Sequence, residues 1–163
     1  MRSAHECLID AELAAFLESP VMIVIGTGAE GAAEIGRGLG AAVEDAGKVL
    51  YLVVSAWQWP ETVAQAHTTG RIAVTFARPT DYVTYQVKGQ VDGVAALTPA
   101  LRAHAARYAS AIVEVLAGLG LPPELTAPWR SERDLVALCV RPEQVFVQTP
   151  GPDAGRPLAR HGA

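Results

Sequence analysis

The sequence predicts a mainly β protein of the α+β class: an antiparallel β-barrel of about six strands with three helices packed on its outside. Two observations favour this fold. Apolar and polar residues alternate with a period of two over residues 71–77 and 82–91, which is the period of strands with one buried face. Residues 33–43 are explained better as a strand than as a helix, because glycines occupy every second position from 36 to 40.

Helices are expected where an apolar stripe lies between start and stop signals. In the first of them, Leu13, Phe16 and Leu17 share one face, and Pro20 ends the segment. Proline and glycine residues mark the ends of the other expected helices and turns in the same way. The elements expected in chain order are a helix at 10–18, strands at 21–25, 33–43 and 48–55, a helix at 61–69, strands at 71–77 and 82–91, a helix from 98 to about 117, and a final pair of strands at 135–140 and 144–148.

The chain is expected to form one domain over residues 1–150. Of its 163 residues 50% are hydrophobic, which is enough apolar surface for a core and excludes a disordered chain. From residue 151 to 163 glycine, proline and arginine dominate, so this segment is expected to be a flexible or draped C-terminal tail.

Charge and composition argue against several classes of function. The formal net charge of −4 at pH 7 disfavours a nucleic-acid binder, which needs a basic surface. No apolar run approaches the roughly 18 residues of a membrane-spanning helix. Cys7 and Cys139 lie far apart, and the four histidines form no cluster with metal-ligand spacing. We therefore expect no metal and a reduced, cytoplasmic setting.

A glycine motif after the first expected strand allows a second interpretation. Gly26, Gly28 and Gly31 match the G-x-G-x-x-G pattern of a Rossmann-type dinucleotide-binding module, in which a helix would follow over residues 32–46. Three further glycines inside that helix would each cost about 1 kcal/mol relative to alanine. The next strand ends in Val53-Val54-Ser55 and lacks the acidic residue that binds a ribose hydroxyl.

As a strand, residues 33–43 present two different faces. Arg37 and its apolar neighbours point one way, and Glu34 and the three glycines point the other. A face of almost bare backbone permits close approach by a flat ligand or by another backbone. The glycines could equally mark bulges at barrel corners, and both uses are compatible.

Three segments carry a resemblance to a known family. They are Glu34-Ile35-Gly36-Arg37-Gly38-Leu39-Gly40, the segment 61–69 leading into Gly70-Arg71-Ile72-Ala73-Val74-Thr75-Phe76, and the segment 81–90. In their order and spacing they resemble the pyridoxamine 5′-phosphate oxidase-like family of FMN-binding split barrels, over roughly residues 8–150. The resemblance implies a split antiparallel barrel that binds FMN between the two subunits of a homodimer.

The resemblance also implies which residues bind the cofactor. Arg37 matches an arginine that holds the flavin phosphate, and a guanidinium suits that role because it offers paired donors and keeps its charge. Its alternative role is a salt bridge to Glu34 or Asp81. Thr62 falls where the family usually has a lysine, which is a departure from the pattern. The cofactor-binding residues implied are Arg37, Gly38, Leu39, Ser55, Thr62, Thr84, Gln86 and Lys88.

Trp57 and Trp59 flank Gln58 in the turn after the third strand. Two tryptophans could wall a planar ring by stacking. Residues of this kind more often fill a dimer interface or cap a core, and that interpretation is favoured here.

The resemblance implies a flavin-dependent oxidoreductase whose substrate and catalytic residues the sequence does not name. Flavin chemistry requires little from the protein beyond positioning, hydrogen bonds to the ring and exclusion of water. The alternatives are a non-catalytic barrel that binds or senses flavin, deazaflavin or haem, and the Rossmann-type module. A small-molecule ligand, without nucleic acid or membrane, is expected in each case.

Overall fold

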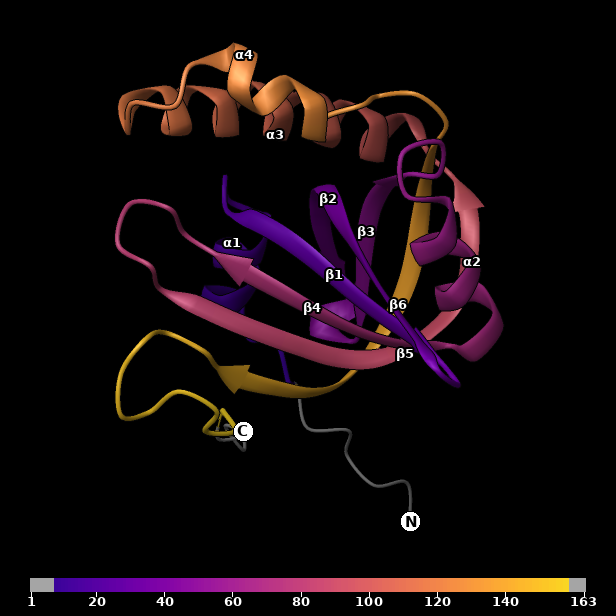
Figure 1. Cartoon of the computed structure of the whole chain (residues 1–163). Helices are drawn as coiled ribbons and strands as arrows, with labels where there is room; N and C mark the ends of the chain where they lie inside the picture. The colour runs from indigo at the N-terminus through magenta and orange to yellow at the C-terminus, as the bar shows by residue number, and fades with distance from the viewer. Residues whose placement is uncertain (1–7, 159–163) are drawn as a thin grey trace.

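Six strands form a closed antiparallel barrel in the computed structural model, which describes residues 8–158 (Figure 1). Around the barrel the order is β1-β2-β3-β6-β5-β4, and every neighbouring pair is antiparallel. The expected fold class is therefore confirmed. The strands are β1 (Met22–Ala29), β2 (Ala32–Glu44), β3 (Val49–Ser55), β4 (Arg71–Ala77), β5 (Thr84–Ala96) and β6 (Leu135–Val147).

Four helices flank the barrel, one more than expected, because a single-turn helix follows the long one. The Asp10 side chain caps the first helix by accepting a hydrogen bond from the Leu13 N–H at 2.8 Å. Figure 1 shows α3 and α4 together over one side of the barrel. The helices are α1 (Ala11–Glu18), α2 (Pro60–Thr69), α3 (Pro99–Gly118) and α4 (Pro123–Thr126), with 3₁₀ turns η1 (Asp45–Gly47) and η2 (Ala127–Trp129).

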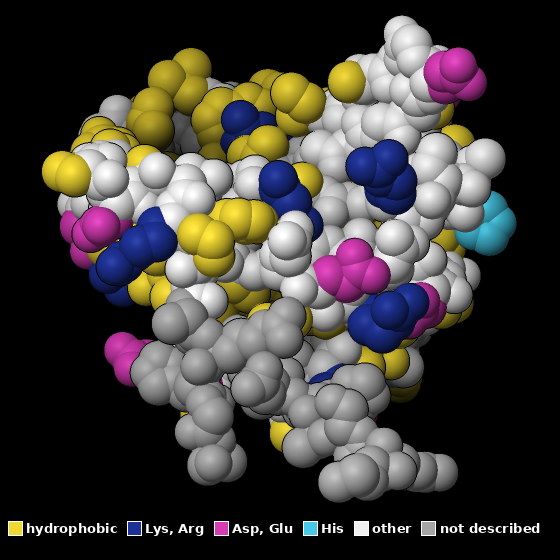
Figure 2. Space-filling view, turned by 90° about the horizontal axis from the view of Figure 1, so that it is seen from below, with side chains coloured by type: hydrophobic (Ala, Val, Ile, Leu, Met, Phe, Trp, Pro, Cys, Tyr) yellow, Lys and Arg dark blue, Asp and Glu magenta, His cyan; other side chains and the backbone are white. Residues whose placement is uncertain are grey.

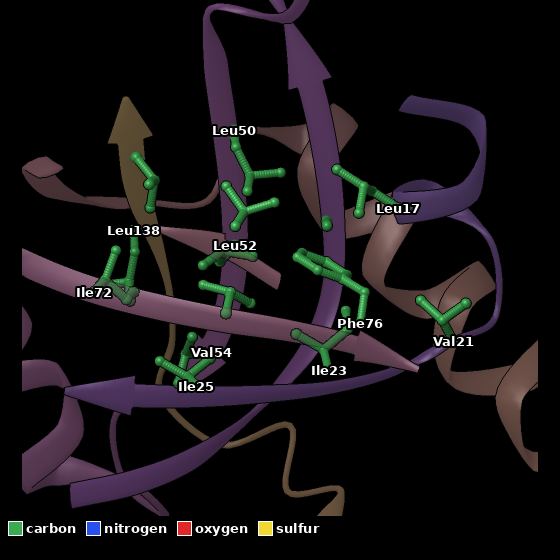
Figure 3. Close-up of a cluster of buried hydrophobic side chains, with 14 of the residues drawn as sticks. Leu17, Val21, Ile23, Ile25, Leu50, Leu52, Val54, Ile72, Phe76 and Leu138 are labelled. Carbon is green, nitrogen blue, oxygen red and sulfur yellow. The ribbon is translucent and has the colours of Figure 1, made fainter. Parts of the chain in front are cut away.

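Alternate residues of the strands point into the barrel and form its core (Figure 3). α1 adds Leu17 to this cluster. The core residues are aliphatic apart from Phe76 and Tyr108, and every strand of the barrel contributes to them. The residues labelled in Figure 3 are Leu17, Val21, Ile23, Ile25, Leu50, Leu52, Val54, Ile72, Phe76 and Leu138.

Residues 33–43, for which the sequence allowed either a helix or a strand, lie in a strand. Residues 32–44 pair with β1 across a tight hairpin, in which Gly31 adopts a φ of 78°. Since no helix follows Gly26 and Gly28, there is no helix N-terminus to receive a pyrophosphate. The Rossmann-type interpretation is therefore wrong.

The glycines of β2 make room for neighbouring elements. A Cβ on Gly36 would lie 3.0 Å from the Thr62 hydroxyl, and one on Gly38 would lie 2.6 Å from the Ile23 side chain. At Gly40, where φ is 127°, β2 passes under α3 next to a register shift in its pairing with β3. The bulge expected among these glycines is confirmed, and side chains and helix α3 make the close approaches.

The expected final pair of strands is one continuous strand, β6. Proline has no N–H for the ladder and usually interrupts a strand, but Pro142 pairs with Gly89 at a bulge. A Cβ at position 89 would lie 2.3 Å from the Arg141 carbonyl oxygen, so glycine there lets the two strands approach. The bulge absorbs the proline, and β6 continues to Val147.

The chain turns back along β6 after that strand ends. The Val147 N–H donates to the Arg156 carbonyl at 2.9 Å, and the Leu158 N–H donates to the Val145 carbonyl at 2.8 Å. The described part of the expected tail, 151–158, thus drapes over the barrel, and the rest of the tail lies outside the described residues. No helix within residues 8–158 is both long and apolar enough to cross a bilayer.

Candidate functional site

Three of the expected cofactor-binding residues, Arg37, Gly38 and Leu39, line one small pocket of about 20 Å³. It lies on the outer side of β2, beneath α3 and η2. Strand alternation explains why Arg37 points outward there, since its neighbour Gly36 pairs directly with the core residue Ile25. The other lining residues are Met22, Ile23, Tyr108, Ile112, Leu116, Trp129 and Arg130.

Arg37 stacks on an aromatic ring and lacks an ion pair among residues 8–158. Its guanidinium carbon lies 4.5 Å from the centroid of the Trp129 ring. Asp81, one of the two expected salt-bridge partners, pairs with Arg78 at 2.8 Å instead. None of the described residues that line the pocket is acidic. The positive charge of Arg37 is therefore not neutralised by the part of the chain that the structure describes.

A second arginine, Arg130, lines the same pocket. Its Nε is buried and makes no hydrogen bond to any described residue. A buried donor without a partner is uncommon and calls for an explanation. Arg130 is not recognisable as a site residue from the sequence, because nothing there indicates that the loop after α4 returns to β2; the adjacent pair Trp129-Arg130 is the available signal.

Tyr108 contributes a neutral hydroxyl at the edge of the pocket. It donates a hydrogen bond to the Val21 carbonyl at 2.6 Å. Burial raises the pKa of Tyr108 far above its usual value, although the nearby Arg37 acts in the opposite direction. The phenol therefore stays protonated and adds no negative charge beside the two arginines.

The turn with two tryptophans holds the loop that carries Trp129 and Arg130. The Gln58 side-chain amide donates to the Pro128 carbonyl and accepts a hydrogen bond from the Ser131 N–H at 3.1 Å. These two bonds fix the loop on both sides of Arg130. Gln58 thus positions this part of the site, a role that its place between Trp57 and Trp59 does not indicate.

Ser55 supports the same connection. Its hydroxyl is buried, donates to the Arg133 carbonyl at 2.6 Å and accepts from the Gln58 N–H at 3.2 Å. With both contacts made inside the protein, the hydroxyl serves the fold of the turn. Trp59 packs against the core, whereas Trp57 is 52% exposed beside Arg133.

Thr62 lies on the other side of β2 from Arg37. It is only 2% exposed and its side chain faces Gly36, from the first turn of α2. Because Gly36 and Arg37 point to opposite faces of the strand, the structure does not bring Thr62 and Arg37 together.

The remaining expected residues lie on β5. Gln86 and Lys88 point outward, since Val87 between them is fully buried. The Gln86 amide donates to the Thr75 hydroxyl at 3.2 Å, and the Lys88 ammonium lies 4.9 Å from the Phe146 ring centroid. Thr84 is buried, and its hydroxyl donates to the Tyr82 carbonyl at 2.8 Å.

β5 is opposite β2 in the barrel. Two strands separate them in either direction, β1 and β4 on one side and β3 and β6 on the other. Outward-pointing side chains of opposite strands diverge. Within one chain, Arg37 therefore cannot share a ligand with Gln86 and Lys88.

A second, larger hollow of about 850 Å³ opens at the end of the β1–β2 hairpin. It contains Lys88 and Arg71, but Glu30 and Glu143 also line it, so its charge is mixed. Figure 2 shows the face seen from below, where Lys and Arg side chains are dispersed and some lie beside acidic ones. The described residues visible on this face form no continuous basic patch.

Comparison with solved structures shows which known proteins share this fold. No protein-family model and no curated protein matches the sequence. Among solved structures, an F420 reductase matches with a TM-score of 0.54 at 19% identity, over 80% of this chain and 93% of its own. HupZ from Group A Streptococcus matches with 0.54 at 15% identity, over 90% and 99%. A candidate pyridoxamine 5′-phosphate oxidase from Lactobacillus delbrueckii matches with 0.52 at 14% identity, over 90% and 100%.

This chain has the split-barrel fold of pyridoxamine 5′-phosphate oxidase-like proteins. The likeness is one of fold, so a cofactor must be inferred from the residues of this split barrel. The Arg37 pocket suits the anionic end of a ligand, because its two arginines face no carboxylate among the described lining residues. Its volume of about 20 Å³ is far below the several hundred Å³ of a site that encloses a whole cofactor. A pocket of this size can admit only a small part of a ligand.

Proposed function

We propose that this split barrel binds a flavin, with FMN as the first candidate, and that Arg37 binds its phosphate. The observation that carries the proposal is the environment of Arg37: an outward guanidinium, stacked on Trp129, in a pocket without a described acidic residue. An arginine of this kind presents paired N–H donors to an oxyanion. The likeness in fold to an F420 reductase and to a candidate pyridoxamine 5′-phosphate oxidase supports a ligand of the flavin type.

The flavin ring then lies along the outer surface of β2. Ile35 shares the outward face with Arg37 and is 67% exposed, and Trp57 follows the end of β3, which pairs with β2 through Gly38 and Val54. Exposed apolar side chains next to a phosphate-binding group suit an amphipathic ligand with a planar ring.

A second copy of the chain completes this site. One side of a ring on the outer surface of β2 would face water, and exclusion of water is part of what flavin chemistry requires. Gln86 and Lys88, on the opposite strand, can reach such a ligand only from another subunit. The protein is therefore a homodimer in this proposal, with the ligand at the interface.

Bound flavin supplies electron or hydride transfer, and the chain supplies binding, orientation and exclusion of water. The proposed activity is accordingly that of a flavin-dependent oxidoreductase. Its substrate would enter beside the ring at the subunit interface.

The test begins with the absorbance spectrum of the purified protein and proceeds to FMN titration by fluorescence quenching. An absorbance band at about 450 nm is expected for bound flavin. A sharp band at about 400 nm would instead indicate that the ligand is haem. Arg37→Ala should weaken FMN binding by about 2–4 kcal/mol, and Arg71→Ala, an exposed arginine on β4, should change it far less. Equal FMN affinities of the wild type and Arg37→Ala would refute the assignment of the phosphate site.

A further inference from the structure

We propose that Arg130 is a second phosphate-binding residue and that Arg37 and Arg130 together form a two-arginine site for a phosphate monoester. The two side chains come from distant parts of the sequence, β2 and the loop after η2, and line one pocket. The inference rests on the proposed flavin binding only for the identity of the molecule that carries the phosphate.

Two features of the pocket point to an anion. Arg37 and Arg130 both line the pocket, and the described lining residues include neither Asp nor Glu to balance their two positive charges. In addition, Arg130 Nε is a buried donor without a hydrogen-bond partner among residues 8–158. An oxyanion in the pocket would satisfy both features at once.

The size of the pocket is consistent with a phosphate group. A volume of about 20 Å³ accommodates roughly one water-sized group, so one or two oxygens of a terminal phosphate can enter while the rest of the ligand stays outside. Each planar guanidinium can donate paired hydrogen bonds to a phosphate, so two of them offer a dianion more donors and more positive charge than one arginine does.

The position of Arg130 is fixed by its neighbours. Trp129 stacks on Arg37, and Gln58 binds the backbone at Pro128 and Ser131, on either side of Arg130. Such fixation reduces the entropic cost of binding. Arg130 also supplies a positive charge at this pocket, whereas Thr62 is neutral and faces the other side of β2.

The experiment compares FMN with riboflavin, which differs from FMN only in lacking the phosphate. Arg130→Met should weaken FMN binding on the order of tenfold or more and leave riboflavin binding unchanged. The matched control Arg102→Met, at an exposed position on α3, should change neither. If Arg130→Met binds FMN as the wild type does, the inference fails and the proposed function stands.

A second measurement does not depend on flavin. Inorganic phosphate should raise the thermal unfolding midpoint of the wild type and of Arg102→Met, but not that of Arg130→Met or Arg37→Met. If the wild type binds no flavin and phosphate still stabilises it in this pattern, the anion site stands and the proposed function fails. If phosphate stabilises none of the proteins and the wild type does not prefer FMN to riboflavin, the inference is overturned. Should Arg130→Met not fold, Arg130→Lys replaces it, with a weaker but measurable loss of FMN affinity expected because lysine keeps the charge without the paired donors.

Discussion

The guanidinium of Arg37 lies 4.5 Å from the centre of the Trp129 ring, so an outward-pointing arginine of the barrel is covered by a loop from the far end of helix α3. This contact connects the two parts of the candidate site. It places Arg130, the next residue, in the same pocket as Arg37.

Replacing Trp129 by alanine should destabilise the protein by about 1–2 kcal/mol. The ring is partly buried against the core and stacks on Arg37, so both apolar burial and the cation–π contact are lost. The matched control is Trp57→Ala: that ring is 52% exposed and also contacts an arginine, and its loss should cost under about 1 kcal/mol. Urea unfolding measures both values, and an equal cost for the two variants would contradict the role given to Trp129.

Ser55→Ala should reduce the free energy of unfolding by about 1–3 kcal/mol, because the Arg133 carbonyl and the Gln58 N–H both lose a buried partner. Ser110→Ala removes a hydroxyl from the exposed face of α3 and should change stability by less than about 0.5 kcal/mol. Chemical denaturation of both variants gives the comparison. A Ser55→Ala protein as stable as the wild type, with weaker FMN binding, would assign the hydroxyl to the cofactor instead.

Gly89→Ala should destabilise the protein by about 1–3 kcal/mol or more, because the new Cβ would lie 2.3 Å from the Arg141 carbonyl oxygen. Gly93→Ala, on the same strand with no atom within 4 Å of the added Cβ, should cost at most about 1 kcal/mol. Thermal unfolding of both variants provides the measurement. If Gly89→Ala is tolerated as well as Gly93→Ala, the close approach of β5 and β6 at Pro142 does not require a glycine.

The proposed two-subunit site predicts complementation between variants. Arg37→Ala and Gln86→Ala should each bind FMN more weakly than the wild type, because each removes a group that a different subunit supplies. When the two proteins are unfolded together and refolded, a mixed dimer has one site with both substitutions and one with neither. About a quarter of the wild-type binding sites should therefore return, if subunits pair at random. Light scattering that gives a monomer, or mixing that restores no binding, would contradict a shared site.

The periodicity of the sequence was sufficient to identify most of the secondary structure. Alternation over 71–77, the glycines of 33–43 and the proline and glycine signals around α2 act locally, since they depend on which backbone conformations each residue tolerates. Local alternation along the strand also separated Arg37 from Gly36 and Gly38, but it did not show which of the two faces lies outside the barrel. These features led to the barrel, and the structure confirms it.

Contacts between distant segments were decided only by the tertiary structure. The continuity of β6 through Pro142 depends on a glycine in a different strand. The placement of Arg130 beside Arg37 depends on hydrogen bonds from Gln58 across the fold. Local propensity carries no information about such pairs, because their energy exists only once the chain has closed the barrel. The sequence by itself therefore determined the strands and the arginine on β2, whereas the folded barrel decided which charges and rings surround that arginine.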